Sequence, residues 1–155
     1  MKQTNKLWYD WKEMRRDVNT LCREIVLDKF DPDVIVGLSR GGLTPGVMMS
    51  HWMKKPFKSI KASLRDYPEW EDYMPRKSDE RVLIVDDICD SGETFHKIRE
   101  HINERKKNGV DVRFATLWWN NECNFEPHYY VNEIAKDTTK TWINFCWESW
   151  WNTPV

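Results

Sequence analysis

Three carboxylates lie close together in the stretch VLIVDDICDSGETF, near the middle of the chain. The apolar run over 82–85 predicts a buried strand that delivers Asp86 and Asp87 to its end and Asp90 to the following turn. A helix is expected to begin directly after that turn. Acidic groups beside a bound phosphate would repel it unless sugar hydroxyls and a divalent cation lie between them. The pattern therefore predicts a site for a phosphorylated sugar together with a metal ion.

A phosphate cradle is predicted at the start of that helix. The backbone amides over 91–94 can point into one concavity at the positive end of the helix, which suits a phosphate monoester. Gly92 allows close approach of the chain, and two hydroxyl side chains add donors. The predicted cradle consists of Asp90, Ser91, Gly92, Glu93 and Thr94.

Alternating strand and helix patterns surround these residues. Apolar residues at three- and four-residue steps predict a first helix over 11–26, with Asp10 and Glu13 as a capping pair. Thr44 and Pro45 have the form of an N-cap and first residue of a second helix. Further elements are expected as strands over 33–38, 57–62, 81–85 and 110–119 and a helix from 95 to about 108. This order predicts an α/β fold with a mostly parallel sheet flanked by helices and a ligand crevice at the carboxyl ends of the strands.

Length and charge exclude several classes of protein. The chain has 155 residues, which suits one domain, and a formal net charge of −1 from 24 basic and 25 acidic residues. Such a balance argues against a nucleic-acid backbone or an anionic membrane as partner. The sequence lacks both an apolar run of the roughly 18 residues that a membrane span needs and a signal peptide, so we expect a cytoplasmic protein. Its four cysteines and four histidines show no metal-ligand spacing.

The acidic stretch resembles the signature of the type I phosphoribosyltransferases. That signature has an apolar strand, two acidic residues, two variable residues, and then Asp, Ser or Thr, Gly, a variable residue and Thr. The matching residues are Asp86, Asp87, Asp90, Ser91, Gly92 and Thr94. The resemblance implies an enzyme that binds 5-phosphoribosyl 1-pyrophosphate and transfers its sugar phosphate to a nitrogen base.

A second stretch resembles the pyrophosphate loop of the same family. It comprises Ser39, Arg40, Gly41 and Gly42, directly after the strand predicted over 33–38. In the family, closely approaching backbone and one arginine hold the leaving pyrophosphate. Since the loop lies one strand–helix unit before the acidic stretch, we expect the two to share a ligand.

Both ends of the chain resemble the xanthine-guanine phosphoribosyltransferases. The segment from Trp8 to Trp11 is similar to the amino-terminal part of that group, and the segments from Thr141 to Ile143 and from Cys146 to Glu148 are similar to its carboxyl-terminal part. The likeness implies that Trp142 stacks on a purine; the alternative for such a tryptophan is a place in the core.

Two positions depart from that group: Cys146, where the related segment usually has proline, and Asn120. Its members usually place a lysine after the strand predicted over 110–119, where it bonds the exocyclic oxygen of the base, but here the matching residue is Asn120. An amide both donates and accepts, so Asn120 does not specify a 6-oxopurine as a lysine would. The resemblance therefore leaves the base open, with guanine, xanthine and hypoxanthine as the first candidates for binding by Asn120 and Trp142.

The resemblance also implies roles for the charged groups. Mg²⁺ is expected at Asp86 and Asp87, directly or through water, and Asp90 is placed to take a proton from the base. A polar loop over 63–80, with Arg65, Arg76 and Lys77, is expected to act as a lid that excludes water.

The whole chain is expected to form one phosphoribosyltransferase domain. Its core would span about 30–120, and its hood, a small cap, would comprise 1–12 and 121–155. We expect the protein to form a homo-oligomer. An alternative function with the same fold is a regulator that senses the activated sugar or a nucleotide and binds RNA, but such a protein should carry a basic face. A salt-dependent RNA-binding assay distinguishes the two.

Overall fold

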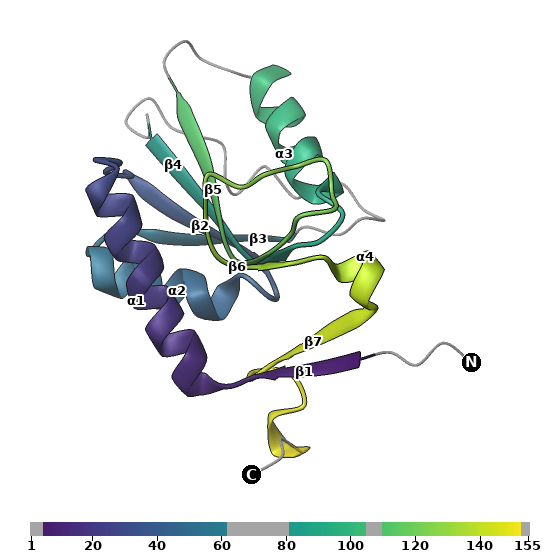
Figure 1. Ribbon diagram of the computed structural model, residues 1–155. Helices are drawn as coiled ribbons and strands as arrows, with labels where there is room; N and C mark the ends of the chain where they lie inside the picture. Colours follow the sequence, from purple (N-terminus) through teal and green to yellow (C-terminus); the bar gives the residue numbers. More distant parts are fainter. Residues whose placement is uncertain (1–4, 62–80, 105–109, 153–155) are drawn as a thin grey trace.

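The structure, a computed structural model, describes residues 5–61, 81–104 and 110–152. The lid predicted over 63–80 lies outside these residues. Five parallel strands form the main sheet in the order β3-β2-β4-β5-β6, and β1 and β7 form a separate parallel pair (Figure 1). The strands are β1 (Asn5–Tyr9), β2 (Val34–Ser39), β3 (Phe57–Lys61), β4 (Arg81–Cys89), β5 (Asp111–Asn120), β6 (Tyr129–Ile134) and β7 (Thr141–Phe145).

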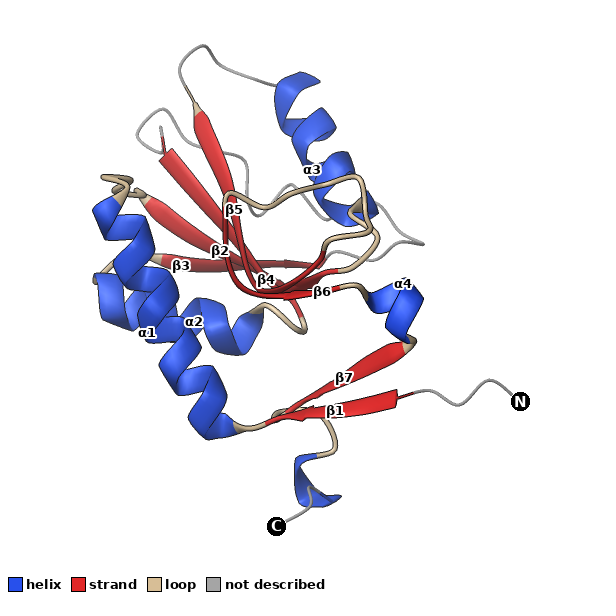
Figure 2. Cartoon of the chain, in the orientation of Figure 1, coloured by secondary structure: helices blue, strands red, loops and turns tan. Residues whose placement is uncertain are grey.

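Helices cover both faces of the main sheet. Figure 2 shows α1 and α2 on one side of it and α3 on the other. The helices are α1 (Trp11–Leu27), α2 (Leu43–Met53), α3 (Glu93–Glu104) and the short α4 (Lys136–Thr139), and a 3₁₀ turn spans Trp150–Asn152. The predicted fold class, a mostly parallel sheet flanked by helices, is confirmed. Within the described residues, no helix has both the length and the apolar character needed to cross a membrane.

The central strands are apolar on both faces because each face has its own core. Ile35, Leu83 and Val85 belong to the cluster under α1 and α2. Val36 and Ile84, which alternate with them, belong to the cluster under α3. Side chains alternate across a strand, so this arrangement explains why the sequence pattern is a continuous apolar run. It also fixes the register that brings the polar strand ends to one edge of the sheet.

Local signals placed α1 accurately and α2 less so. The predicted capping box of α1 is present, since Asp10 accepts from the Glu13 amide at 2.7 Å and Glu13 accepts from the Asp10 amide at 3.0 Å. In α2, the predicted N-cap was wrong. The helix begins at Leu43 with Gly42 as its N-cap, which places Thr44 inside the first turn.

Two strands differ from the sequence prediction. β4 continues to Cys89 instead of ending at residue 85, and Asp86 pairs in register with Thr116 of β5. β6, which lies inside the range 121–155, pairs with β5 in the main sheet and not with β1 or β7. The division of the chain into a core and a hood remains a prediction.

A buried carboxylate ties the β1–β7 pair to the main sheet. Asp17 of α1 is 2% exposed and accepts from the Tyr9 hydroxyl at 2.6 Å and from the Asn132 amide at 2.9 Å. These contacts join β1, α1 and β6. The orientation of the β1–β7 pair over the sheet therefore depends on a satisfied polar network.

Removal of the Tyr9 hydroxyl should destabilise the protein. Tyr9→Phe leaves the buried Asp17 carboxylate without one donor, so we expect the free energy of unfolding to fall by about 1–3 kcal/mol in urea denaturation. Tyr130→Phe is the matched control, because its hydroxyl donates to Glu126 at 3.3 Å in an exposed setting. Equal stability of Tyr9→Phe and the control would contradict the structural role of the network.

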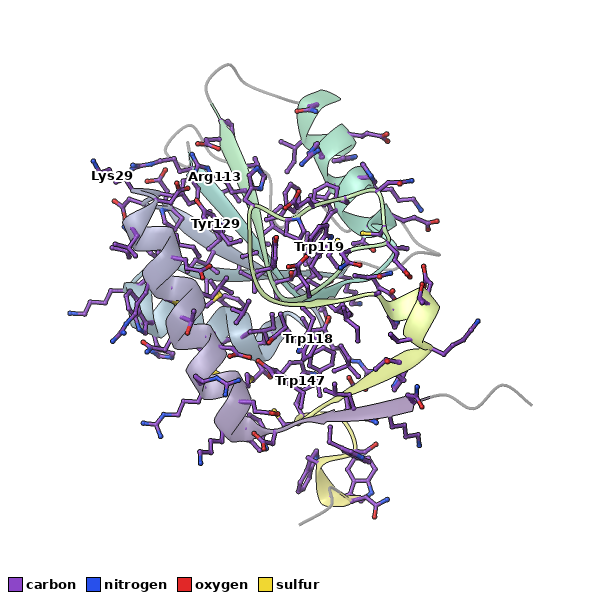
Figure 3. The ribbon with its side chains drawn as sticks, in the orientation of Figure 1. Lys29, Arg113, Trp118, Trp119, Tyr129 and Trp147 are labelled. Carbon is purple, nitrogen blue, oxygen red and sulfur yellow. The ribbon has the colours of Figure 1, made fainter. Side chains whose placement is uncertain are left out.

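His128 gives the fold a pH dependence. Its Nδ1 accepts from the Phe114 amide at 3.0 Å, which requires a neutral ring. Burial and the nearby cations of Arg99 and Arg113 lower the pKa of His128; Arg113 itself donates to the Tyr129 hydroxyl (Figure 3). The unfolded chain therefore binds a proton more readily than the folded protein does.

The expected result is a loss of stability in mild acid. The contribution of His128 is full above its unfolded pKa of about 6.5 and is lost as the pH falls toward the lowered folded pKa, at no more than about 1.4 kcal/mol per pH unit. Denaturation at pH 7.5, 6.5 and 5.5 measures it. His128→Asn, which cannot titrate, should flatten the slope. A parent-like slope in His128→Asn would assign the effect to other groups.

Candidate active site

Two adjacent carboxylates form the centre of the site. Asp86 and Asp87 are half-buried near the carboxyl end of β4. Asp86 Oδ1 accepts from the Asp87 amide at 2.9 Å, and Asp87 Oδ1 accepts from the Ile88 amide at 2.7 Å. Burial raises the pKa of both groups, and the charge of Asp87 further raises the pKa of Asp86. The pair is therefore held in place by backbone donors, and its burial favours the protonated form of both carboxyl groups.

Each carboxylate lines a different hollow. Asp86 lines one of about 430 Å³ together with the predicted cradle residues Asp90, Ser91, Gly92 and Thr94. Asp87 lines another of about 1020 Å³ together with Arg40 and Gly41 of the predicted pyrophosphate loop. Neighbouring residues of one strand thus line the two hollows. A ligand with a phosphate at each end could lie across the pair.

The first hollow is built at the amino end of α3. Ser91 Oγ accepts from the Glu93 amide at 3.3 Å at the start of the helix. Gly92 has a φ of 79°, and a Cβ added there would lie 2.7 Å from the Cβ of Phe125. Only glycine meets both conditions without strain. The helix dipole and the first-turn amides make this end suitable for an anion.

The second hollow begins at the turn between β2 and α2. A Cβ added at Gly41 would lie 2.3 Å from Oδ2 of Asp87, so backbone and carboxylate are packed directly together. The Gly42 amide already donates to the Leu38 carbonyl at 2.8 Å. The Ser39–Arg40 peptide is cis.

The wall opposite this turn comes from the carboxyl-terminal segment. The residues that line the hollow there are Trp147, Glu148, Ser149, Trp150 and Trp151. Burial raises the pKa of Glu148, as does the charge of Asp87, while Arg40 lowers it. Trp147 packs against the core cluster that contains Trp118, between the main sheet and β7 (Figure 3). Sequence reasoning gave Glu148 no role, although an acid in this conspicuous segment was a usable signal.

Two further predicted site residues, Asn120 and Trp142, lie near Asp90. Asn120, 2% exposed, donates to the Asp90 carbonyl at 3.0 Å. Its Oδ1 accepts from the Lys136 amide at 3.1 Å, so both ends of its side chain are engaged. Trp142, on β7, is 51% exposed. Lys136 connects them, since its Nζ lies 2.5 Å from Asp90 Oδ2 and 5.0 Å from the centroid of the Trp142 ring. Sequence reasoning missed Lys136, because no local pattern marks it.

A divalent cation fits this chemistry only with help from a ligand. Across the described ranges, no three His, Cys, Asp or Glu side chains converge as a ready metal site. Mg²⁺, however, is commonly held by one or two carboxylates together with substrate oxygens and water. The Asp86–Asp87 pair supplies two carboxylates. The residues present therefore fit Mg²⁺ that arrives with a phosphorylated substrate.

The sequence of the chain matches a known protein family and several of its members. The family described as "Phosphoribosyl transferase domain" matches residues 7–152. A xanthine-guanine phosphoribosyltransferase from Chromohalobacter salexigens is 26% identical over 143 residues, which cover 89% of this chain and 81% of that protein.

Solved structures agree with this match. A purine phosphoribosyltransferase from Pyrococcus horikoshii is 28% identical with a TM-score of 0.77, covering 98% of this chain and 97% of that one. A xanthine-guanine-hypoxanthine phosphoribosyltransferase from Helicobacter pylori, 19% identical, shares the fold with a TM-score of 0.80 over 93% and 94% of the two chains. The resemblance inferred from the acidic stretch is thus confirmed.

Proposed function

The chain belongs to the phosphoribosyltransferase family, and we propose that it transfers the 5-phosphoribosyl group of 5-phosphoribosyl 1-pyrophosphate to a purine, with release of pyrophosphate. The observation that carries this proposal is the position of the acidic pair between two hollows. Asp86 lines the one at the start of α3 and Asp87 lines the one beside Arg40. Such an arrangement matches a sugar that carries a phosphate at one end and a pyrophosphate at the other.

The cradle and the loop would divide the binding of this substrate. The 5-phosphate is assigned to Asp90, Ser91, Gly92, Glu93 and Thr94 at the start of α3, where the helix dipole favours an anion. The pyrophosphate is assigned to the loop of Ser39, Arg40, Gly41 and Gly42, with the Arg40 guanidinium as its cation. The ribose then lies over Asp86 and Asp87.

The reaction exchanges one bond at the anomeric carbon for another. The bond from that carbon to the pyrophosphate oxygen breaks, and its electron pair leaves with pyrophosphate. A ring nitrogen of the base forms the new bond, and Asp90 accepts the proton that the base loses. Positive charge develops on the ribose during the exchange, and Asp86 and Asp87 lie where negative charge stabilises it. Mg²⁺, held by Asp86 and Asp87 directly or through water, would neutralise charge on the pyrophosphate.

A purine is the proposed acceptor. The relatives from Chromohalobacter salexigens and Pyrococcus horikoshii are named as purine enzymes. Trp142 offers an exposed planar surface on the side of the site where Asp90 lies, which suits a stacked heterocycle. Guanine, xanthine and hypoxanthine are the preferred candidates. We also propose that the chain acts as a single domain, as a homo-oligomer, in the cytoplasm.

Release of pyrophosphate tests this function. The protein is mixed with the activated sugar, Mg²⁺ and one base at a time from guanine, hypoxanthine, xanthine, adenine, uracil and orotate. We expect pyrophosphate and the matching nucleotide with at least one purine. Turnover of a pyrimidine alone would overturn the choice of base, and no turnover with any base would overturn the enzymatic function.

A further inference from the structure

Lys136 extends from α4 into the proposed base site. Its side chain is only 15% exposed, and its Nζ donates to Asp90 Oδ2 at 2.5 Å. The same Nζ lies over the Trp142 ring, 5.0 Å from its centroid. One ammonium group thus contacts both the proposed proton acceptor and the proposed stacking surface. Asp90 Oδ2 and the Trp142 centroid are therefore separated by no more than the sum of these two distances, which brings the proposed proton acceptor and stacking surface within reach of one bound base.

The backbone around Lys136 is held in this position by side chains of the β5 end. The buried Asn120 accepts from the Lys136 amide at 3.1 Å while it donates to the Asp90 carbonyl at 3.0 Å. Glu122 accepts from the amides of Asp137 at 2.8 Å and Thr138 at 3.0 Å. These bonds fix α4 against the strand ends. Lys136 is therefore placed by the fold and is not a surface lysine that happens to reach an acid.

We propose that Lys136 selects bases that carry an oxygen at the six position. This inference rests on the proposed purine transfer and names the group that reads the base. The six-position oxygen of a purine and its nitrogen seven lie on the same edge of the ring. A purine that stacks on Trp142 with this edge toward Asp90 brings the oxygen to the Lys136 ammonium. An ammonium has three donors and no acceptor, so it bonds an oxo group and offers no acceptor to an amino group.

The two contacts of the Lys136 ammonium can be exchanged for contacts with a base. The ammonium occupies the space above Trp142 and pairs with Asp90. An incoming base takes that space by stacking, and the ammonium moves to the edge of the base. A cation–π contact and an ion pair are thereby exchanged for a stack and a charge-assisted hydrogen bond. Asp90 loses its partner as the base arrives and becomes available to accept a proton.

Asn120 then has a positioning role in this arrangement. Its amide holds the backbone of Asp90 and of Lys136 at a fixed separation. A neutral residue at this position is compatible with recognition of an oxopurine, because the positive charge comes from α4 instead of β5.

Two nucleotides that differ at the six position test the proposal. Inosine 5′-monophosphate carries the oxygen, whereas purine riboside 5′-monophosphate carries hydrogen there. Calorimetry should give the parent protein at least about tenfold tighter binding of the first. Lys136→Met, of similar length but uncharged, should lose about ten- to a hundredfold in affinity for the first and less than about threefold for the second. Lys140→Met is the matched control, since Lys140 is exposed at the end of the same helix, and it should behave as the parent does.

The outcomes separate this inference from the proposed function. Equal loss of both nucleotides in Lys136→Met would mean that the lysine only supports the site, and no loss would mean that it does not contact the base. Equal affinities in the parent would overturn the proposal even if the variant failed to fold. Absence of pyrophosphate release by the parent with every base would instead refute the transferase function, which the nucleotide comparison does not measure.

Discussion

Replacement of both Asp86 and Asp87 by asparagine should reduce pyrophosphate release by at least about a hundredfold while the protein stays folded. The loss follows because the two carboxylates act on charge that develops only in the transition state, and the loss of such groups costs about 2.7 kcal/mol or more. Asparagine keeps an Oδ1 that can accept from the amides that Asp86 and Asp87 now bind. The backbone at the end of β4 should therefore be preserved.

The same variant should be no less stable than the parent at neutral pH. The folded pKa of both groups is raised above the unfolded value. Their contribution to stability is therefore full below the unfolded pKa and is lost as the pH rises through the folded pKa. At neutral pH the two carboxylates destabilise the fold. Neutral side chains remove the destabilising contribution. Urea denaturation at pH 7.5 measures it, with Asp31→Asn, which alters an exposed ion pair with Lys55, as the control for activity and stability. Turnover within a few-fold of the parent in the double variant would refute the central role of the pair.

Gly41→Ala should be almost as damaging, because it acts through Asp87. The new Cβ would lie 2.3 Å from Oδ2 of that carboxylate, so the side chain or the loop must move. We expect kcat/KM to fall by about a hundredfold and the affinity for the activated sugar by about tenfold. Enzyme assay and calorimetry measure the two effects.

A double-mutant cycle isolates the cause. In an Asp87→Ala background the colliding carboxylate is absent, so the addition of Gly41→Ala should weaken sugar binding by less than about threefold. The two substitutions should therefore couple by about 0.7 kcal/mol or more in binding. Additive effects would mean that Gly41 and Asp87 contribute independently to binding of the activated sugar. That result would contradict the proposed collision between the new Cβ and the carboxylate.

The sequence predicted the elements that carry strong local signals. α1 was placed by its apolar period and by Asp10 and Glu13, and the two-sided apolar runs located β2 and β4. The amino end of α2 was misplaced because Thr44 and Pro45 satisfy local capping preferences, whereas the helix begins where Leu43 donates to the Arg40 carbonyl. β4 was predicted too short because pairing of Asp86 with Thr116 extends the strand beyond its apolar part.

The base side of the site was the least predictable part. β6 contains polar residues such as Asn132 and Glu133, so the apolar pattern that marks a buried strand is weak there. The position of Lys136 depends on that strand and on the bonds from Asn120 and Glu122, which are remote in sequence. A lysine in a short polar segment carries no signal of its own. The phosphate cradle and the pyrophosphate loop, by contrast, are each contiguous in sequence and directly follow an apolar strand, so each could be predicted from its own stretch.

The parallel pairing of β1 with β7 has a consequence for how the chain folds. Asn5 donates to the Thr139 carbonyl across 134 residues of sequence, so this pair closes a loop that contains nearly all of the protein. Closing so long a loop is entropically expensive and becomes favourable only after the intervening sheet has formed. During synthesis, β2 to β5 can assemble while β7 is still being made. The phosphate cradle and the pyrophosphate loop are therefore expected to form first, and the last parts of the site to form should be the stacking surface of Trp142 and the wall over 147–151.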